Sequence, residues 1–272
     1  MWKKAFLLLF CLSVLASAAH LNIVSPVAQE VTSAEQLIDF GIVGPGQKIE
    51  VIADRGTGER VETGGEAKWE QLRVLGEDLP AGWRNESSFL YESPMKAFIV
   101  LPKHALDGTY FFQMHTYDEY EGTPSMSVRG KVVVSINVLE LEALKKTVVA
   151  GVGQPAVFLI RLRNKSSASD AFEISVAGVP AEWAFPRRVF VSHNSEAVIA
   201  YEVVGAEKGE FSITIQARSL SSDAITAKEK VSLKTQSSLL NDAQATSHGI
   251  LLFPSIQQII YSLIGFAANV LA

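Results

Sequence analysis

Cysteine is nearly absent from the chain. The one cysteine, Cys11, lies in an apolar N-terminal stretch and lacks the small residues that precede the cysteine of a bacterial lipoprotein leader. If that stretch is removed, the remaining chain has no thiol, so it can form neither a disulfide nor a cysteine-based metal site. We therefore expect its cores to be stabilised by packing alone, as is typical of an archaeal or bacterial envelope protein.

Patterns of catalytic residues are also missing. No G-x-S-x-G motif appears, and the histidines are scattered without an i, i+4 pair: His20, His104, His115, His193 and His248. The letters GVGQPA at residues 151–156 fit the dinucleotide pattern G-x-G-x-x-A, which needs a helix to begin there. The following letters, VFLIRLRN, alternate like a strand instead. The sequence thus predicts no enzyme, no cofactor and no metal.

Positive charge is in short supply as well. The formal net charge is −5, and removal of a leader with two lysines would make it −7. That sign argues against nucleic acid or an anionic lipid surface as the partner. The acidic run Asp118, Glu119 and Glu121 could contribute to a calcium site, but it lacks the spacing of a calcium loop, so we interpret it as a solvated turn.

The N-terminus has the pattern of a secretory signal peptide over residues 1–19. Lys3 and Lys4 precede an apolar stretch, and Ala16-Ser17-Ala18 forms an A-x-A-like cleavage site. We expect export and cleavage near Ala18 or Ala19, with an uncleaved signal anchor as the alternative.

At the other end, residues 249–272 contain no charged residue. At 1.5 Å per residue a helix of this length reaches roughly 36 Å, enough for a hydrocarbon core of about 30 Å. Five small or amide side chains step by three or four residues and so share one stripe, which predicts packing against another transmembrane helix. These residues are Ser255, Gln258, Ser262, Gly265 and Asn269.

Other interpretations of this segment stay open. It could lie flat in the interface, although it has no Lys or Arg for a polar face, and Gln257 lies off the stripe. It could also be a lipid-anchor signal with a small-residue site at residues 241–243. With no basic residue after the segment, we expect no cytoplasmic tail.

Between the ends, one pattern occurs twice at an interval of about 100 residues. The first copy contains GPGQKIEVIAD, LPAGW, an apolar strand near residues 96–101, and DGTYFFQM. The second contains GVGQPAVFLIRLRN, VPAEW, a strand near residues 197–203, and KGEFSITIQA. The four segments of each copy agree in order, spacing and residue type, so the sequence predicts two copies of one domain.

The apolar residues in these copies have the period of strands. Val157, Leu159 and Leu162 alternate with polar or cationic neighbours, and a second alternating set follows Gly209. That second set is Phe211, Ile213, Ile215 and Ala217. No long apolar stripe at helical spacing lies between residues 20 and 235. The fold class is therefore predicted to be all-β, with two tandem immunoglobulin-like β-sandwiches.

These motifs resemble a known group of domains. Gly-x-Gly-Gln before an alternating strand, a Pro-Ala-x-Trp step and a Gly-x-aromatic strand are similar to the α-galactosidase-associated (NEW-type) and CARDB adhesion-related domains of archaeal and bacterial surface proteins. The resemblance is best over residues 146–233 and looser over residues 22–138, where residues 55–67 form an additional Gly- and Glu-rich loop. It implies a fold and a surface setting, and no catalytic residue.

The motifs set the domain boundaries. We place the first sandwich at 20–139, the second at 140–234, a polar stalk at 235–248 and the anchor at 249–272, with residues 139–144 as a link. Trp83 and Trp183 occupy the same segment of the two copies, so we interpret them as core or corner residues rather than as sugar platforms. The sequons at Asn85 and Asn164 fall in predicted loops and are possible glycosylation sites.

The predicted function is that of a non-catalytic, membrane-tethered extracytoplasmic protein. It would be a structural or interaction subunit of an envelope membrane complex, with a membrane protein or a second copy as its partner. A carbohydrate-binding or adhesion module is the alternative, which needs exposed coplanar aromatics. The candidates are Trp69, Tyr91, Tyr117 and Tyr120. An enzyme with an unrecognised polar cluster is the third hypothesis.

Overall fold

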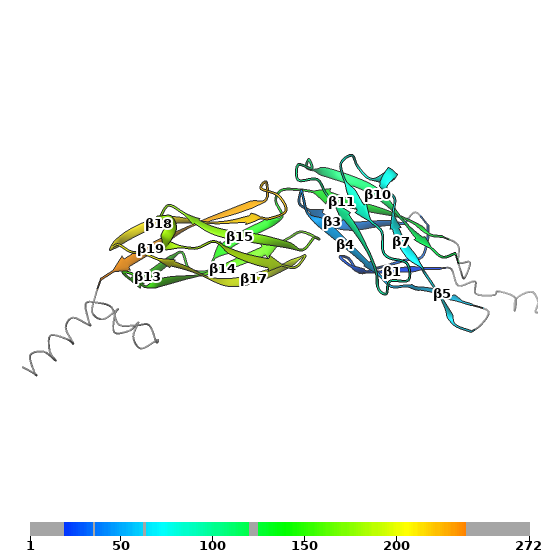
Figure 1. Ribbon diagram of the computed structural model, residues 1–272, viewed down its shortest axis with the longest axis horizontal. Helices are drawn as coiled ribbons and strands as arrows, with labels where there is room; N and C mark the ends of the chain where they lie inside the picture. The colour runs from blue at the N-terminus through cyan, green and yellow to red at the C-terminus, as the bar shows by residue number, and fades with distance from the viewer. Residues whose placement is uncertain (1–18, 35, 62–63, 120–124, 238–272) are drawn as a thin grey trace, which may run out of the picture. The chain divides into compact units, whose positions relative to one another are not determined.

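A computed structural model describes residues 19–34, 36–61, 64–119 and 125–237 of the chain. These residues form two compact units (Figure 1): unit 1 spans residues 19–136 with Ser166–Ser169, and unit 2 spans residues 137–165 with residues 170–237. Each unit has its own buried core. The predicted signal peptide and the predicted anchor with its stripe lie outside the described residues, apart from Ala19.

Unit 1 consists of two packed sheets and a small hairpin. Its strands are β1 (Leu21–Ser25), β2 (Gln29–Val31), β3 (Leu37–Val43), β4 (Lys48–Ala53), β5 (Gly56–Arg60), β6 (Glu66–Lys68), β7 (Gln71–Val74), β8 (Arg84–Glu86), β9 (Met95–Val100), β10 (Gly108–Tyr117) and β11 (Ser127–Val134), with a 3-10 turn η1 (Gly76–Asp78). One sheet has the order β2-β1-β4-β9-β8, and the other has the order β3-β11-β10-β7.

Unit 2 also consists of two sheets, but its strands are distributed differently between them. Its strands are β12 (Leu139–Ala143), β13 (Thr147–Gly151), β14 (Pro155–Asn164), β15 (Asp170–Ala177), β16 (Arg187–Val191), β17 (Ser195–Val204), β18 (Gly209–Ser219) and β19 (Thr226–Gln236), with a 3-10 turn η2 (Ala181–Trp183). The sheets have the orders β12-β14-β17 and β13-β19-β18-β15-β16.

The strand order identifies both units as immunoglobulin-like sandwiches. In each, an early strand leaves the first sheet and pairs in parallel with the last strand: β3 with β11, and β13 with β19. The other pairings are antiparallel; some join consecutive strands, and others, such as β4 with β9 and β15 with β18, link strands that are distant in sequence, as in Greek-key sandwiches. The predicted fold class is confirmed for the described part of the chain.

The Gly-x-Gly-Gln motif forms the same turn in both units. Gly46 and Gly153 have φ values of 73° and 75°, in the left-handed region that favours glycine. The turn closes through Gln47 N–H to Gly44 O (3.3 Å) and through Gln154 N–H to Gly151 O (3.0 Å). After the second turn comes the strand β14 and no helix, so the dinucleotide match is accidental, as predicted.

The alternation identified the buried face correctly for one strand and wrongly for another. Ile213, Ile215 and Ala217 of β18 are buried as expected. In β14, Phe158, Ile160 and Leu162 point inward, whereas Val157 and Leu159 are 43% and 44% exposed. The VFLI run is apolar on both faces, and since strand side chains alternate strictly, an error of one residue inverts the face.

Three expected boundaries also differ from the structure. Leu139–Ala143, predicted as a link, is β12, which pairs with β14 of unit 2. Thr235, the first residue of the predicted stalk, is buried in β19. The predicted loop at 55–67 is largely the hairpin of β5 and β6.

Candidate functional site

The candidate site is a loop of unit 1, residues 87–92, which follows β8 and runs along the free edge of β7. Ser88 N–H donates to Leu72 O (3.0 Å), and Leu72 N–H donates back to Ser88 Oγ (2.9 Å). Further along, Tyr91 N–H donates to Glu70 O (2.8 Å). The loop therefore satisfies backbone groups that β7 would otherwise leave unpaired at the edge of its sheet.

Three consecutive apolar side chains of this loop lie in solvent. Phe89 is 80% exposed, Leu90 is 54% exposed and Tyr91 is 60% exposed. A short turn carries them, closed by Phe89 N–H to Glu92 Oε2 (3.1 Å) and by Glu92 N–H to Phe89 O (3.3 Å). Exposed apolar side chains gathered in one place mark an interaction surface more often than isolated ones do.

The backbone of Tyr91 is strained. Its φ is 61°, a left-handed conformation that is unfavourable for a bulky residue. Such strain costs on the order of 1–3 kcal/mol and persists only where the surroundings enforce it. Here the hydrogen bond from Tyr91 N–H to the buried Glu70 residue holds the backbone in place.

Polar and charged groups surround the base of the apolar loop. The guanidinium of Arg55 lies 5.6 Å from the centroid of the Tyr91 ring, and the Tyr91 hydroxyl donates a long hydrogen bond (3.5 Å) to the carboxylate of Glu70. On the neighbouring strand, Arg73 lies 4.2 Å from the ring centroid of Tyr117. An apolar centre with a polar rim is the usual composition of a protein–protein contact.

Tyr117 near this rim has a pKa above the ordinary value of a tyrosine. A hydrogen bond with Glu119 raises the pKa of Tyr117, and desolvation and the charge of the same carboxylate raise it further. The phenol therefore keeps its proton to a higher pH than an ordinary tyrosine and can serve as a hydrogen-bond donor. Glu119 thus contacts the tyrosine, while Asp118 beside it is buried and Glu121 lies outside the described residues.

The structure does not bring the four predicted sugar-stacking aromatics onto one platform. Trp69 is fully buried, and its indole N–H donates to His20 O (2.9 Å). Its selection was wrong because the β5–β6 hairpin precedes it and the chain then returns into the core. Tyr91 is exposed, Tyr117 is half-buried beneath Arg73, and Tyr120 lies outside the described residues.

Trp83 and Trp183 are core residues, as predicted. They are 8% and 5% exposed, and each contacts the aromatic residue of the Gly-x-aromatic segment. The ring centroids of Trp83 and Tyr110 are 5.3 Å apart, and those of Trp183 and Phe211 are 4.9 Å apart. Both tryptophans therefore stabilise the corner of a sandwich and are not available to a ligand.

The two sequons differ in their surroundings. Asn164 is fully buried at the end of β14, where its amide donates to Val191 O and Ser192 O, both at 3.2 Å. The prediction that Asn164 lies in a loop that can carry a glycan is therefore wrong, since a folded unit 2 has no space for one. Asn85 is half-buried in β8, and its amide donates to Val74 O.

Within the described ranges, no group of three His, Cys, Asp or Glu residues could hold a metal ion. In the same residues, no helix is long and apolar enough to cross a membrane. The stripe of Ser255, Gln258, Ser262, Gly265 and Asn269 lies beyond residue 237 and stays a prediction.

The solved structures with likeness to this chain have low sequence identity to it. Fibronectin(III)-like modules of Clostridium thermocellum CbhA are 14% identical, covering 80% of this chain and 94% of that chain with a TM-score of 0.26. A chimeric titin Z1Z2 is 11% identical, with 81% and 99% covered and a TM-score of 0.35. The CARDB domain of a Pyrococcus furiosus protein, in complex with di-metal ions, is 13% identical, with 35% and 85% covered and a TM-score of 0.26.

No protein-family model matches the chain, and no curated protein matches it. Because these TM-scores are below 0.5, the likeness carries no argument about ligands or partners. The immunoglobulin-like assignment rests on the strand order of the two units. Membership of the NEW-type or CARDB families stays a prediction.

Proposed function

We propose that this chain is a non-catalytic interaction protein that binds a protein partner through the 87–92 loop of unit 1. The observation that carries the proposal is the exposure of Phe89, Leu90 and Tyr91 on a loop that hydrogen bonds fix to β7. Burial of one such side chain contributes about 1.5–3 kcal/mol, so three together are a substantial source of affinity.

The rigidity of the loop supports this proposal. A contact surface that is already ordered loses less conformational entropy on binding than a flexible one. The hydrogen bonds of Ser88 with Leu72 of β7 and of Tyr91 with Glu70, just before β7, order the backbone before any partner arrives. Tyrosine is also among the residues that most often dominate the binding energy of an interface.

The setting of the interaction follows from the two ends of the chain. The leader pattern in residues 1–19 and the uncharged segment 249–272 favour export and tethering to the cytoplasmic membrane, with both units outside the cytoplasm. In this proposal the stripe from Ser255 to Asn269 contacts a membrane protein, and unit 1 contacts a partner in the extracytoplasmic space.

Site-specific photo-crosslinking in the native membrane tests the proposal. A photoreactive phenylalanine analogue replaces Phe89, and the same analogue replaces Phe185 as a matched control, because Phe185 is 79% exposed but lies in unit 2. We expect one defined protein adduct from position 89 and none from position 185. Equal adducts from both positions, or none from position 89, would contradict the proposal.

The identified partner then allows a quantitative test. Tyr91→Ser is expected to weaken its binding about tenfold or more, equivalent to about 1.4 kcal/mol, whereas Phe185→Ser leaves it unchanged. A copy ending at Ser237, which keeps β19 whole, separates the contribution of the C-terminal segment. Partners that only the full chain retains would assign assembly to that segment.

A further inference from the structure

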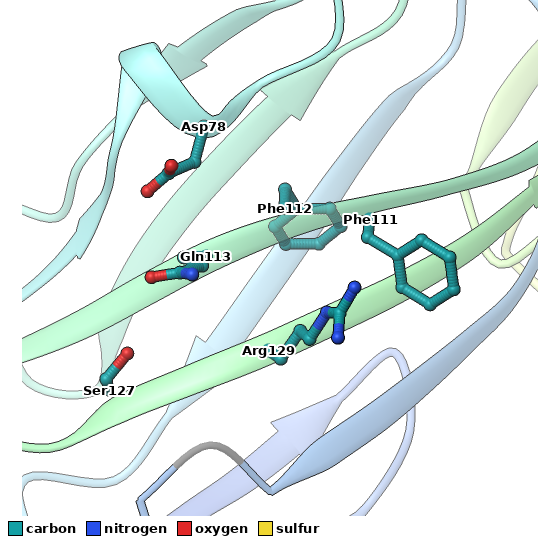
Figure 2. Close-up of a pocket in the computed structure, with 6 residues that line it drawn as sticks. All are labelled: Asp78, Phe111, Phe112, Gln113, Ser127 and Arg129. Carbon is teal, nitrogen blue, oxygen red and sulfur yellow. The ribbon is translucent and has the colours of Figure 1, made fainter.

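A pocket of about 440 Å³ lies on the outer face of the β3-β11-β10-β7 sheet of unit 1 (Figure 2). It is lined by Asp78, Phe111, Phe112, Gln113, Ser127 and Arg129. None of these residues belongs to the 87–92 loop, so the pocket is separate from the proposed protein-binding surface. Its volume is within the range of small-ligand sites.

The strand register places the lining residues. β10 and β11 are antiparallel, with Gln113 opposite Arg129 and His115 opposite Ser127. Because side chains alternate along a strand, Phe111 and Gln113 face outward while Phe112 between them is buried in the core. Gly130, opposite Phe112, has no Cβ and leaves the space that the Phe112 ring fills.

The turn η1 provides the remaining wall. Leu75 N–H, just before the turn, donates to Gln113 O (3.3 Å) and ties the turn to β10. Asp78 ends η1 and is exposed. Figure 2 shows its carboxylate on one side of the pocket and the guanidinium of Arg129 beside Phe111 on the other.

The pocket contains two charged side chains, Asp78 and Arg129, that form no ion pair among the described residues. The guanidinium of Arg129 lies 4.5 Å from the ring centroid of Phe111, and among the described residues it has no ion pair. The nearby cation Lys131 is neutralised by Asp39 at 2.7 Å. Arg129 is therefore an oriented cation that is ready to pair with an anion of a ligand.

These groups indicate the chemistry of the ligand. Arg129 only donates hydrogen bonds, ionised Asp78 only accepts them, and Gln113 with Ser127 can do both. A matching ligand carries a carboxylate at one end and several hydroxyls elsewhere. One face of the Phe111 ring is covered by Arg129, so on that face the guanidinium is presented to the ligand.

The backbone around the pocket argues against an added peptide strand. β10 is paired on both sides, by β11 and β7, and β11 is paired on both sides, by β10 and β3. A peptide that binds as an additional strand needs a free sheet edge, which this position lacks. A ligand in this pocket is therefore bound by side chains and not by pairing with a strand.

From these observations we infer that the pocket binds an acidic saccharide, with the sugar carboxylate on the Arg129 guanidinium and the sugar hydroxyls on Asp78, Gln113 and Ser127. This goes beyond the proposed protein interaction and uses different residues. The predicted aromatic platform of Trp69 and its neighbours is not involved.

Ligand-observed NMR on the full chain in detergent tests the inference. Titrations with glucuronate and with glucose compare two sugars that differ by one carboxylate. We expect glucuronate to bind about tenfold more tightly than glucose, because a charge-assisted, bidentate pair with arginine is stronger than a neutral hydrogen bond. Arg129→Gln is expected to abolish that preference.

Arg73→Gln is the matched control. Arg73 also places a guanidinium on an aromatic ring of the same sheet, 4.2 Å from the Tyr117 centroid, but it does not line the pocket. This variant should keep the preference for glucuronate, and so should Tyr91→Ser, whose effect belongs to the protein partner. Retention of sugar binding in Tyr91→Ser thus distinguishes this inference from the proposed function.

Three outcomes would overturn the inference. Equal affinity for glucose and glucuronate would remove the role of the carboxylate. An unchanged preference in Arg129→Gln would place the sugar elsewhere. Saturable binding of an acidic peptide such as triaspartate, with no binding of either sugar, would replace the saccharide by a protein ligand.

Discussion

Units 1 and 2 each contain the same kind of aromatic corner, but the strand that follows the corner joins a different sheet in each unit. Each corner contains a tryptophan, an aromatic ring and a glycine beneath that ring: Gly108 under Tyr110, and Gly209 under Phe211. After Trp83 the chain forms β8, which joins β9 in the first sheet. After Trp183 it forms β16, which joins β15 in the second sheet.

The residues of the two strands explain this difference. β16 contains Val189 and Val191, which alternate toward the core and can line a sheet. β8 is Arg84-Asn85-Glu86 and has no apolar side chain to bury. Unit 1 therefore covers the edge of β7 with hydroxyls and amides of a loop, and the apolar residues of that loop are left in solvent.

The largest expected effect comes from the shared corner. Trp83→Ala and Trp183→Ala should each destabilise their own unit by about 3–5 kcal/mol, the usual cost of removing a large buried aromatic. Urea unfolding with hydrogen exchange measured in each unit separates the two effects. Equal destabilisation of both units by either variant would contradict two separate cores, and Phe185→Ala, at an exposed site, serves as the control.

Glycine substitutions should distinguish the two units next. A Cβ at Gly130 would meet the Phe112 ring at 2.4 Å, whereas a Cβ at Gly209 would meet the Phe211 ring at 3.0 Å. Gly130→Ala should therefore cost about 1–3 kcal/mol through overpacking, and Gly209→Ala less. The midpoint of thermal unfolding checks the order, and a larger shift for Gly209→Ala would show that Phe112 can move freely.

The covered edge of β7 gives an effect of similar size that is confined to unit 1. Ser88 is 2% exposed, and its hydroxyl accepts the N–H of buried Leu72. Ser88→Ala leaves that N–H without its partner, which should cost about 1–3 kcal/mol and increase hydrogen exchange at Leu72. Ser175→Ala, on the corresponding strand β15, is the control. Unchanged protection of Leu72 would contradict the role of the loop in capping β7.

Acidification should produce the smallest effect. Hydrogen bonds from Lys131 to Asp39 and from Lys234 to Glu210 hold the pKa of each carboxyl below its usual value. A lowered folded-state pKa stabilises the folded protein above the unfolded pKa, 3.8 for aspartate, and this stability is lost as pH falls below it. Lys131→Met should reduce the acid sensitivity of unit 1 and leave that of unit 2 unchanged, as measured by unfolding between pH 6 and pH 3.

The repeated motifs predicted the fold because they are structural. Gly46, Gly153 and the two corner tryptophans occupy positions where backbone conformation or packing requires their residue type. The alternation of apolar residues could not show which face of β14 is buried, because apolar residues lie on both faces. The same alternation does indicate that Asn164 is buried, because Asn164 lies two residues after buried Leu162 and so faces inward.

The sites were harder to predict. The sequence indicated Tyr91 as a candidate exposed aromatic but not Phe89 and Leu90 beside it, because no sequence motif marks the hydrogen bonds of Ser88 to β7 that fix this loop. The pocket combines Asp78 with residues of β10 and β11, which meet only once the strand register is known. Trp69 was misassigned because its position after the β5–β6 hairpin gives no local sign of burial.

The parallel pair of β13 and β19 has a mechanical consequence. Its register runs from Thr147 opposite Ser232 to Gly151 opposite Gln236, so the chain enters at one end of the pair and leaves at the other. A pull transmitted to Thr147 and Gln236 therefore loads these backbone hydrogen bonds together in shear, instead of opening them one at a time. A unit built in this way resists tension along the chain.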